Sequence, residues 1–148
     1  MIEALRPGVT INTLEYFLNV DDLLVLRHTN LTDAQRREFL LNAFRQIGKP
    51  YDFNFDVETD RRIVCSELAY VVFKNEEWPT SKALGRYTIS PDNVAVKARS
   101  GNPFTPVIMY YDGYRIDDRL GETLDALLAR DYVKVRDMHG LTRRSQQP

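Results

Sequence analysis

The chain contains one cysteine, Cys65, and two histidines. A single cysteine cannot form an internal disulfide, and two histidines without further cysteines have no zinc-ligand spacing. The fold must therefore be held together by packing. With 148 residues, of which 43% are hydrophobic, the chain is long enough to build the core of one ordinary domain.

Charge and hydropathy exclude several classes of function. The 20 basic and 21 acidic residues are mixed along the chain and give a formal net charge of -1, so we expect no nucleic-acid binding and no polybasic membrane contact. Apolar stretches such as Leu23 to Leu26 are far too short to span a bilayer, and the N-terminus has no basic region followed by a long apolar core. As written, the sequence predicts a soluble, cytoplasmic chain, although a truncated start would remove any signal peptide.

The apolar pattern predicts an α+β order of elements, with helices and strands in separate runs. Residues 22–27 read as a buried strand. A helix follows, which Thr32 and Gln35 begin through a capping box and which Gly48 and Pro50 end. One apolar face of this helix is formed by Leu40, Ala43, Phe44 and Ile47.

The remaining elements are predicted from local signals. A second helix begins at Cys65, and Ser90 followed by Pro91 predicts a short helix to about Lys97. The later segments are predicted as a strand over 106–111, a hairpin turn at Asp112-Gly113, a return strand over 114–116, a helix over 120–128, a last strand over 132–135 and a disordered tail over 143–148.

Cys65 stands where a short β-type run meets a helical run. A helix N-terminus offers unpaired N–H groups and a dipole that favours negative charge, which suits a thiolate nucleophile and its oxyanion. The alternative is that Cys65 is a small buried hydrophobe without a chemical role. The position of the cysteine alone leaves both interpretations open.

The pattern around Cys65 resembles a known signature. The stretch reads Ile47-Gly-Lys-Pro-Tyr-Asp-Phe53, then Phe55, then Cys65-Ser-Glu-Leu68. It resembles the YiiX/YaeF/YebB-like branch of the NlpC-type hydrolases, a circularly permuted papain-like family. An upstream stretch resembles the same family and consists of Ile2-Glu-Ala, Gly8-Val9, Leu14, Phe17 and Leu24-Val-Leu-Arg27.

The resemblance implies a fold and a division of the chain. It implies a papain-like α+β fold in which the helix that bears the cysteine packs on an antiparallel sheet. Residues 1–106 would form the permuted hydrolase domain, N-terminally incomplete. Residues 107–142 would form a C-terminal β/α extension packed on it, before the tail.

The resemblance also assigns roles to three residues. Cys65 matches the nucleophile, Tyr51 matches a tyrosine near the oxyanion site, and Glu3 matches the group that orients the catalytic histidine. Without the resemblance, Tyr51 could be a half-buried aromatic and Glu3 a solvated terminal residue. Ser66 and Glu67, in the first helical turn, are not assigned a catalytic role. The acidic residues from 52 to 60 lack the glycine and final glutamate of an EF-hand, so we interpret them as a solvated loop.

The catalytic histidine of the family lies upstream of the position that Glu3 occupies. His28 and His139 do not match it, so the resemblance leads us to expect one of three explanations: a fragment of a longer protein, a misplaced start, or a pseudoenzyme. A domain without its first strands would expose apolar surface. We therefore expect self-association or completion by another chain.

Two classes of function follow. The first is a cysteine hydrolase that cleaves an amide, or an ester, through a thioacyl intermediate without any metal or organic cofactor. The resemblance points to cell-wall peptides or lipid-linked amides as substrates. The second is a catalytically inactive binding or assembly module, for which Tyr110, Tyr111 and Tyr114 could supply an interface unless they only pack across strands.

Overall fold

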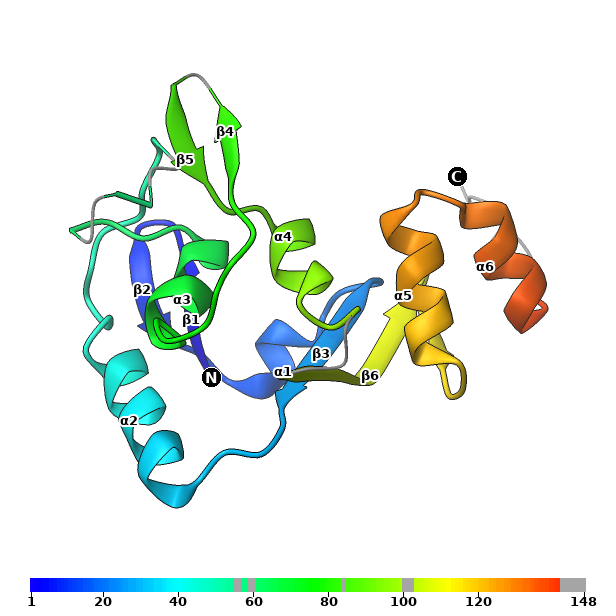
Figure 1. The fold of residues 1–148 in the computed structure, drawn as a ribbon, viewed down its shortest axis with the longest axis horizontal. Helices are drawn as coiled ribbons and strands as arrows, with labels where there is room; N and C mark the ends of the chain where they lie inside the picture. Colours follow the sequence, from blue (N-terminus) through cyan, green and yellow to red (C-terminus); the bar gives the residue numbers. More distant parts are fainter. Residues whose placement is uncertain (55–56, 59–60, 84, 100–102, 142–148) are drawn as a thin grey trace.

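The computed structural model describes residues 1–54, 57–58, 61–83, 85–99 and 103–141. The chain order is β1 (Ile2–Leu5), β2 (Gly8–Ile11), α1 (Leu14–Phe17), β3 (Leu23–His28), α2 (Asp33–Phe44), α3 (Cys65–Val72), β4 (Ser81–Ala83), β5 (Arg86–Thr88), α4 (Pro91–Val96), β6 (Phe104–Tyr111), β7 (Tyr114–Ile116), α5 (Leu120–Leu128) and α6 (Tyr132–His139). Figure 1 shows α3 beside the β1–β2 hairpin, and α5 and α6 at the other end of the molecule.

The strands form antiparallel sheets. β1 pairs with β2, β4 pairs with β5, and a three-stranded sheet has the order β3-β6-β7. The combination of helices with antiparallel sheets confirms the α+β class predicted from the sequence, although helices and strands are interspersed along the chain and do not form separate runs. The hairpin between β6 and β7 turns at Asp112 and Gly113, whose φ angles of 53° and 73° suit a tight two-residue connection.

Two helices begin as their sequences predict. At α2, Thr32 Oγ1 accepts from the backbone N–H of Gln35 at 3.3 Å, and the Gln35 side chain accepts from the Thr32 N–H at 3.0 Å. At α4, Ser90 Oγ accepts from the backbone N–H of Asn93 at 3.1 Å, and Pro91 occupies the first turn. These side chains satisfy N–H groups that the helix itself cannot pair.

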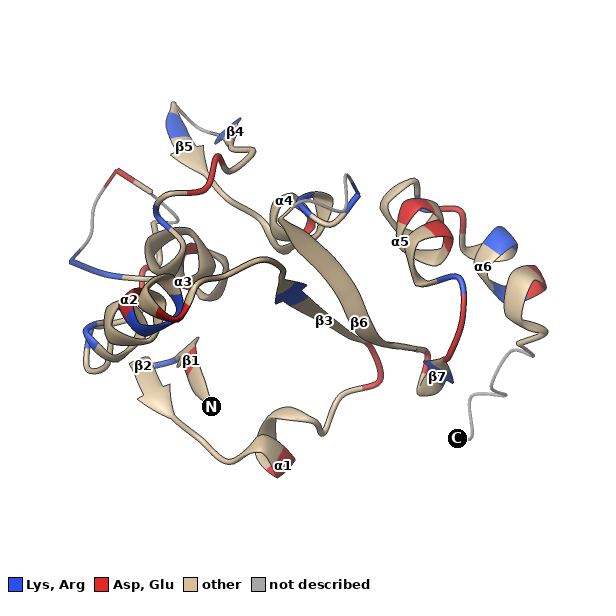
Figure 2. Cartoon of the chain, turned by 60° about the horizontal axis from the view of Figure 1, so that its bottom comes forward, with Lys and Arg blue, Asp and Glu red and all other residues tan. Residues whose placement is uncertain are grey.

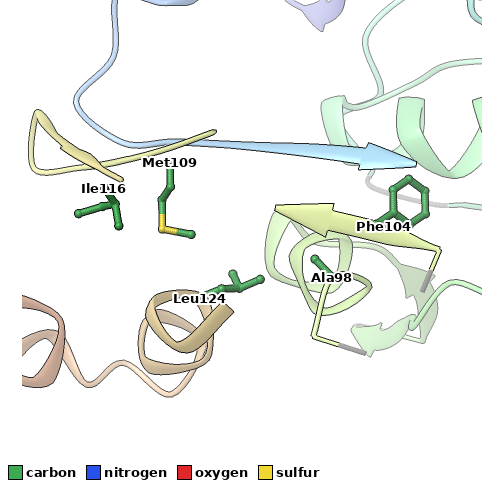
Figure 3. Packing of buried hydrophobic residues seen from close by; sticks show 5 residues of the cluster. All are labelled: Ala98, Phe104, Met109, Ile116 and Leu124. Carbon is green, nitrogen blue, oxygen red and sulfur yellow. The ribbon is translucent and has the colours of Figure 1, made fainter. Parts of the chain in front are cut away.

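The larger hydrophobic core lies between the β3-β6-β7 sheet and α5. Its buried residues are Ala98, Phe104, Met109, Ile116 and Leu124. Figure 3 shows Leu124 of α5 close to Met109 of β6 and Ile116 of β7. Each fully buried side chain of this size contributes about 1.5–3 kcal/mol, so this cluster fixes the C-terminal helices on the sheet.

A smaller core joins α3 to the first hairpin. Ala4 of β1, Val9 of β2 and Ile63 are buried together, with Leu68 and Val71 of α3 packed against them. The cysteine-bearing helix therefore packs on an antiparallel pair of strands, as the resemblance implies. This cluster determines where the start of α3 lies.

The prediction of a last strand over 132–135 is wrong. These residues belong to α6, whose first turn is capped by Asp131, which accepts from the backbone N–H of Lys134 at 3.1 Å. Gly140 ends the helix with a φ of 62°. The short, mostly apolar run Tyr132 to Val135 had suggested a strand, but the capping residues on both sides favour a helix.

The apolar face predicted for α2 points to solvent. The helix, predicted to end at Gly48, ends at Phe44. Leu40 and Phe44, together with Ile47 beyond its end, are 55%, 54% and 38% exposed, whereas Phe39 and Asn42 face the interior. The reason is that α2 packs on α3 through Phe39. Continuous apolar spacing on a helix does not by itself say which neighbouring element will cover it.

The expected boundary at residue 106 lies within β6, which pairs with β3 from Phe104 to Tyr110. The family division into 1–106 and 107–142 stays a prediction. The tail predicted to be disordered, 143–148, lies outside the described residues.

Figure 2 shows basic and acidic residues interspersed along the helices. Among the described residues, no helix has both the length and the apolar sequence required to cross a bilayer.

Candidate active site at the start of α3

Cys65 is the first residue of α3 and its thiol is exposed. Val64 precedes it in an extended conformation, with φ -92° and ψ 165°, and accepts the first helical hydrogen bond from the Leu68 N–H at 3.1 Å. Valine has no polar side-chain atom, so Val64 cannot cap the N–H groups of the first turn. The exposure argues against the interpretation of Cys65 as a buried hydrophobe.

Ser66 and Glu67 hold the first turn of α3 in place. The Glu67 Oε2 atom accepts from the Val64 N–H at 2.9 Å, and the Ser66 hydroxyl donates to the Ile89 carbonyl at 2.6 Å. Both residues are buried: Glu67 is 2% exposed and Ser66 is 7% exposed. They point away from solvent while Cys65 faces it, so they position the turn.

Tyr51 lies beside the segment that leads into Cys65. Its backbone forms a parallel bridge with Ile63, and the Ile63 N–H donates to the Pro50 carbonyl at 3.1 Å. On its other side, the Tyr51 N–H donates to the Pro7 carbonyl at 2.9 Å. Residue 51 is therefore placed between the β1–β2 turn and the start of α3.

The pKa of Tyr51 reflects the burial of its phenol and the charges around it. Burial raises the pKa of Tyr51 above its ordinary value, and the negative charge of the nearby Cys65 thiolate raises it further. The Arg6 guanidinium lowers this pKa, while the carboxylates of Glu67 and Asp52 raise it. The structure thus brings Tyr51 close to Cys65, and the phenol retains its proton at neutral pH and can donate a hydrogen bond.

Glu3 lies on β1, the strand on which α3 packs. Its side chain is 9% exposed, and the Asn12 Nδ2 group donates to its Oε1 atom. This burial argues against a solvated terminal residue. Asn12 was not identified from the sequence; the antiparallel register of β1 and β2, which brings the end of β2 back beside β1, is the signal that could have found it.

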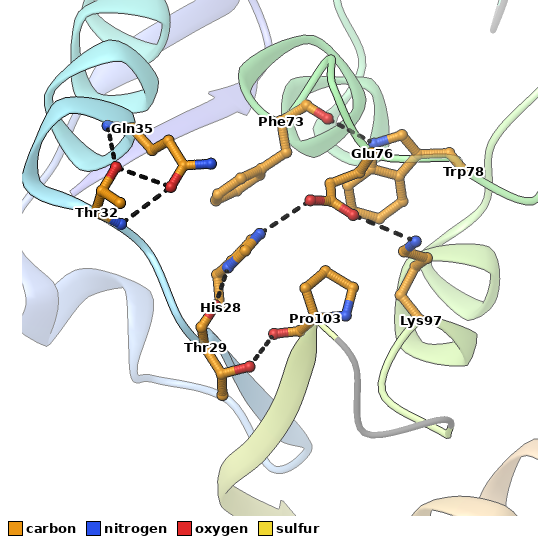
Figure 4. A network of polar contacts seen from close by, with 9 residues as sticks. All are labelled: His28, Thr29, Thr32, Gln35, Phe73, Glu76, Trp78, Lys97 and Pro103. Atoms are coloured by element: carbon orange, nitrogen blue, oxygen red, sulfur yellow. Dashed lines mark hydrogen bonds and ion pairs between the residues drawn. The ribbon is translucent and has the colours of Figure 1, made fainter.

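His28 lies at the other end of α3 from Cys65. Its ring is stacked on Phe73, the residue that ends α3, with centroids 5.8 Å apart. Since α3 has eight residues, its two ends are separated by about 12 Å. The two ring nitrogens face the Thr29 carbonyl at 2.7 Å and Glu76 Oε1 at 3.0 Å (Figure 4). His28 therefore has no ring nitrogen available to Cys65.

His139 lies in α6, far from α3 in both views of the fold (Figures 1 and 2). Its Nε2 atom is 2.7 Å from the Thr123 hydroxyl, and its Nδ1 atom is 3.4 Å from Asp118 Oδ1. These contacts join α6 to α5. Neither histidine of the chain is thus brought to Cys65 by the fold.

Comparison of the sequence with models of known protein families gives one match. The sequence profile described as "Permuted papain-like amidase enzyme, YaeF/YiiX, C92 family" matches residues 1–118. The chain belongs to this family. The match covers the exposed thiol, Tyr51 and Glu3, and it confirms the resemblance inferred from the sequence. Searches of curated proteins and of solved structures give no significant match.

Membership in the permuted papain-like amidases makes this chain a cysteine hydrolase by family. Among the described residues, no three side chains of His, Cys, Asp or Glu converge into a group that could hold a metal ion. The interpretation of the acidic residues from 52 to 60 as a solvated loop is wrong for Asp52, which is 1% exposed and accepts from the Asn54 N–H at 2.9 Å. Asp56 and Asp60 of that loop lie outside the described residues.

A shallow depression of about 580 Å³ lies elsewhere on this permuted papain-like chain. It is lined by Glu77, Trp78, Pro79, Val96, Lys97 and Arg99. Trp78 donates to the Phe73 carbonyl at 3.1 Å, so the depression lies towards the end of α3 and not at Cys65. Its position gives it no part in the chemistry of the thiol.

Proposed function

We propose that Cys65 is the nucleophile of a hydrolase that cleaves an amide, or an ester, through a thioacyl intermediate. The observation that carries this proposal is the exposed thiol on the first residue of α3, with no side-chain cap from Val64 and with the phenol of Tyr51 close by. Thiolate, N–H donors and a neutral hydroxyl are the groups that acyl transfer requires.

In the first half of the reaction, the Cys65 thiolate adds to the substrate carbonyl carbon. The carbonyl oxygen becomes an oxyanion, which accepts hydrogen bonds from N–H groups at the start of α3 and from the Tyr51 hydroxyl. The C–N bond then breaks, the amine leaves with a proton, and a thioester remains on Cys65. Water hydrolyses this thioester to a carboxylic acid and the free thiol.

We propose that a histidine outside these 148 residues accepts the thiol proton and returns it to the leaving group. Glu3 would orient that imidazole. The hydrogen bond from Asn12 occupies Oε1 of Glu3, so Oε2 is the atom proposed to accept from the ring. The position of Glu3 on the strand beneath α3 supports this role.

The substrates proposed are cell-wall peptides or lipid-linked amides. Both classes present an amide carbonyl to the thiol, and neither requires a metal ion for the steps above. This part of the proposal derives from the resemblance to the family and not from a pocket at Cys65.

The thioacyl step can be tested with p-nitrophenyl acetate and intact-protein mass spectrometry. We expect one acetyl group on Cys65, formed faster in the folded chain than in the chain unfolded in urea. Cys65→Ala removes the adduct, and Tyr51→Phe slows its formation because one oxyanion donor is lost. Equal acetylation rates in the folded and unfolded chains would contradict the proposal.

A second candidate is an inactive papain-like binding or assembly module. Two observations favour it: both histidines make structural contacts away from Cys65, and Leu40 and Phe44 of α2 are exposed. Free imidazole separates the candidates. It should accelerate release of the acetyl group from Cys65 more in the folded chain than in the unfolded chain if the site is a hydrolase lacking only its base, and equally in both if the site is dead.

The same apolar face of α2 offers a surface for the expected self-association or completing chain. Sedimentation of the wild type and of the double variant Leu40→Gln, Phe44→Gln tests this expectation. A monomeric wild type would exclude self-association through α2, whereas a dimer lost in the double variant would support it.

A further inference from the structure

We propose that Arg6 forms a subsite that binds a carboxylate group of the substrate next to Cys65. The inference rests on the proposed function of Cys65, and it adds a substrate class: amides that carry a carboxylate near the bond that is cleaved. It is carried by the stacking of Arg6 on Phe53, the contact of Phe53 with Tyr51, and the closeness of Tyr51 to the thiol.

Three neighbouring backbone segments connect the turn that contains Arg6 to the segment that leads to Cys65. The turn that contains Arg6 is hydrogen-bonded to the Tyr51 segment through the Pro7 carbonyl, and Tyr51 is bridged to Ile63, two residues before Cys65. Since paired segments lie about 4.8 Å apart, the Arg6 turn is about 10 Å from the segment that leads to the thiol. An extended arginine side chain and a short acyl group together span such a distance.

Aromatic rings hold the guanidinium in this position. The Arg6 Cζ atom lies 4.9 Å from the centroid of the Phe53 ring, and Phe53 contacts Tyr51 edge-to-face with centroids 5.2 Å apart. A guanidinium over an aromatic face is oriented by the cation–π interaction, and its N–H groups remain available at the edge. The guanidinium thus packs on the exposed Phe53, which in turn packs on the half-buried Tyr51 beside the thiol.

The charge of Arg6 acts on the same phenol as the thiolate. It lowers the pKa of Tyr51, whereas the Cys65 thiolate raises it, so both charged groups lie near that hydroxyl. Among the described residues, no carboxylate forms an ion pair with Arg6. The guanidinium can therefore pair with an incoming anion.

The surrounding acids favour a carboxylate over a phosphate. Asp52 and Glu67 both act on Tyr51, and their negative charges oppose a doubly charged group more strongly than a singly charged one. A planar carboxylate also fits the fork of the guanidinium through two parallel hydrogen bonds. A singly charged carboxylate is thus the anion that this neighbourhood accepts best.

Two alkylating reagents test the subsite without any knowledge of the natural substrate. Iodoacetate and iodoacetamide react with the only thiol of the chain through the same displacement of iodide, but only iodoacetate carries a carboxylate. The measured quantity is the rate constant for iodoacetate divided by that for iodoacetamide. A unit charge about 6 Å from the reacting carboxylate in water changes this ratio by about threefold.

We expect Arg6→Gln to lower the ratio by about threefold, and Arg6→Lys to retain most of it because the charge is kept. High salt should reduce the wild-type ratio. The matched control is Arg136→Gln, which removes another guanidinium held over a ring, 5.9 Å from the Tyr111 centroid, at the other end of the molecule. This control should leave the ratio unchanged.

The outcomes separate the subsite from the nucleophile. If iodoacetamide reacts faster in the folded than in the unfolded chain, but the ratio is equal in the wild type and Arg6→Gln, the subsite is wrong and the nucleophile stands. If the ratio falls in Arg6→Gln while iodoacetamide shows no acceleration, the anion subsite stands and the activated thiol is wrong. An equal fall in Arg136→Gln would overturn the subsite, because the effect would then be one of net charge.

Discussion

Replacing His28 by alanine should destabilise the protein without changing the reactivity of Cys65. The His28 ring contacts Phe73, Phe104 and Phe39 at centroid distances of 5.8, 4.9 and 5.9 Å, and its Nε2 atom lies 3.0 Å from Glu76. Aromatic contacts contribute about 0.5–1.5 kcal/mol each, and a hydrogen bond to a charged group contributes about 1.5–3 kcal/mol. Because such contributions overlap, we expect a loss of about 3–4 kcal/mol in the free energy of unfolding.

The assay combines urea unfolding with iodoacetamide labelling of the folded protein. His28→Phe is the matched variant, since it keeps a ring among the three phenylalanines but removes both polar contacts, and it should lose about half as much stability as the alanine variant. Both variants should label Cys65 at the wild-type rate under conditions in which they remain folded. A large fall in the labelling rate at unchanged stability would refute the structural role and make His28 the base.

Three further predictions follow from the packing around the site. Gly8→Ala should lower the free energy of unfolding by about 1–3 kcal/mol, because the new Cβ would collide with the Lys49 backbone carbonyl. Gly121→Ala should raise it by about 0.5–1 kcal/mol, because a Cβ at this position meets nothing within 4 Å. Urea unfolding of both variants checks the pair. Ser66→Ala should cost about 1–3 kcal/mol, because the Ile89 carbonyl loses its donor, and hydrogen exchange should show faster opening at the start of α3. Tyr51→Phe should alter the alkaline limb of stability: the pKa of Tyr51 is raised in the folded state, so its contribution is complete below the ordinary tyrosine pKa of about 10 and is lost as pH rises through the higher folded value. Between about pH 10 and the higher folded pKa, the free energy of unfolding should therefore fall less steeply in the variant than in the wild type. Identical pH profiles of the two proteins would contradict the placement of Tyr51.

The elements that the sequence predicts well are those with strong local signals. Each depends on residues close together in the sequence: the helix N-termini at Thr32 with Gln35 and at Ser90 with Pro91, and the hairpin turn at Asp112 with Gly113. No distant contact is required to determine them. Strands β1 and β2 have four residues each. They owe their pairing to the core beneath α3, which a local pattern cannot show.

The same distinction applies to the site. The position of Cys65 at a helix start is a local property and was predictable. The closeness of Tyr51 depends on a parallel bridge to Ile63, and the burial of Glu3 depends on the hairpin register; motif resemblance pointed to both residues, but residue patterns alone did not. The aromatic environment of His28 combines residues from three separate segments, which no spacing in the sequence reveals.

The most direct test of the account is the rate at which iodoacetamide alkylates Cys65 at about pH 6, where a free thiol is almost entirely protonated. The wild-type chain suffices, because Cys65 is its only cysteine. We predict that the folded chain reacts about twofold to fivefold faster than the same chain unfolded in urea, the factor expected for negative charge at an exposed helix N-terminus. Equal rates in the two states would contradict the claim that the start of α3 activates this thiol.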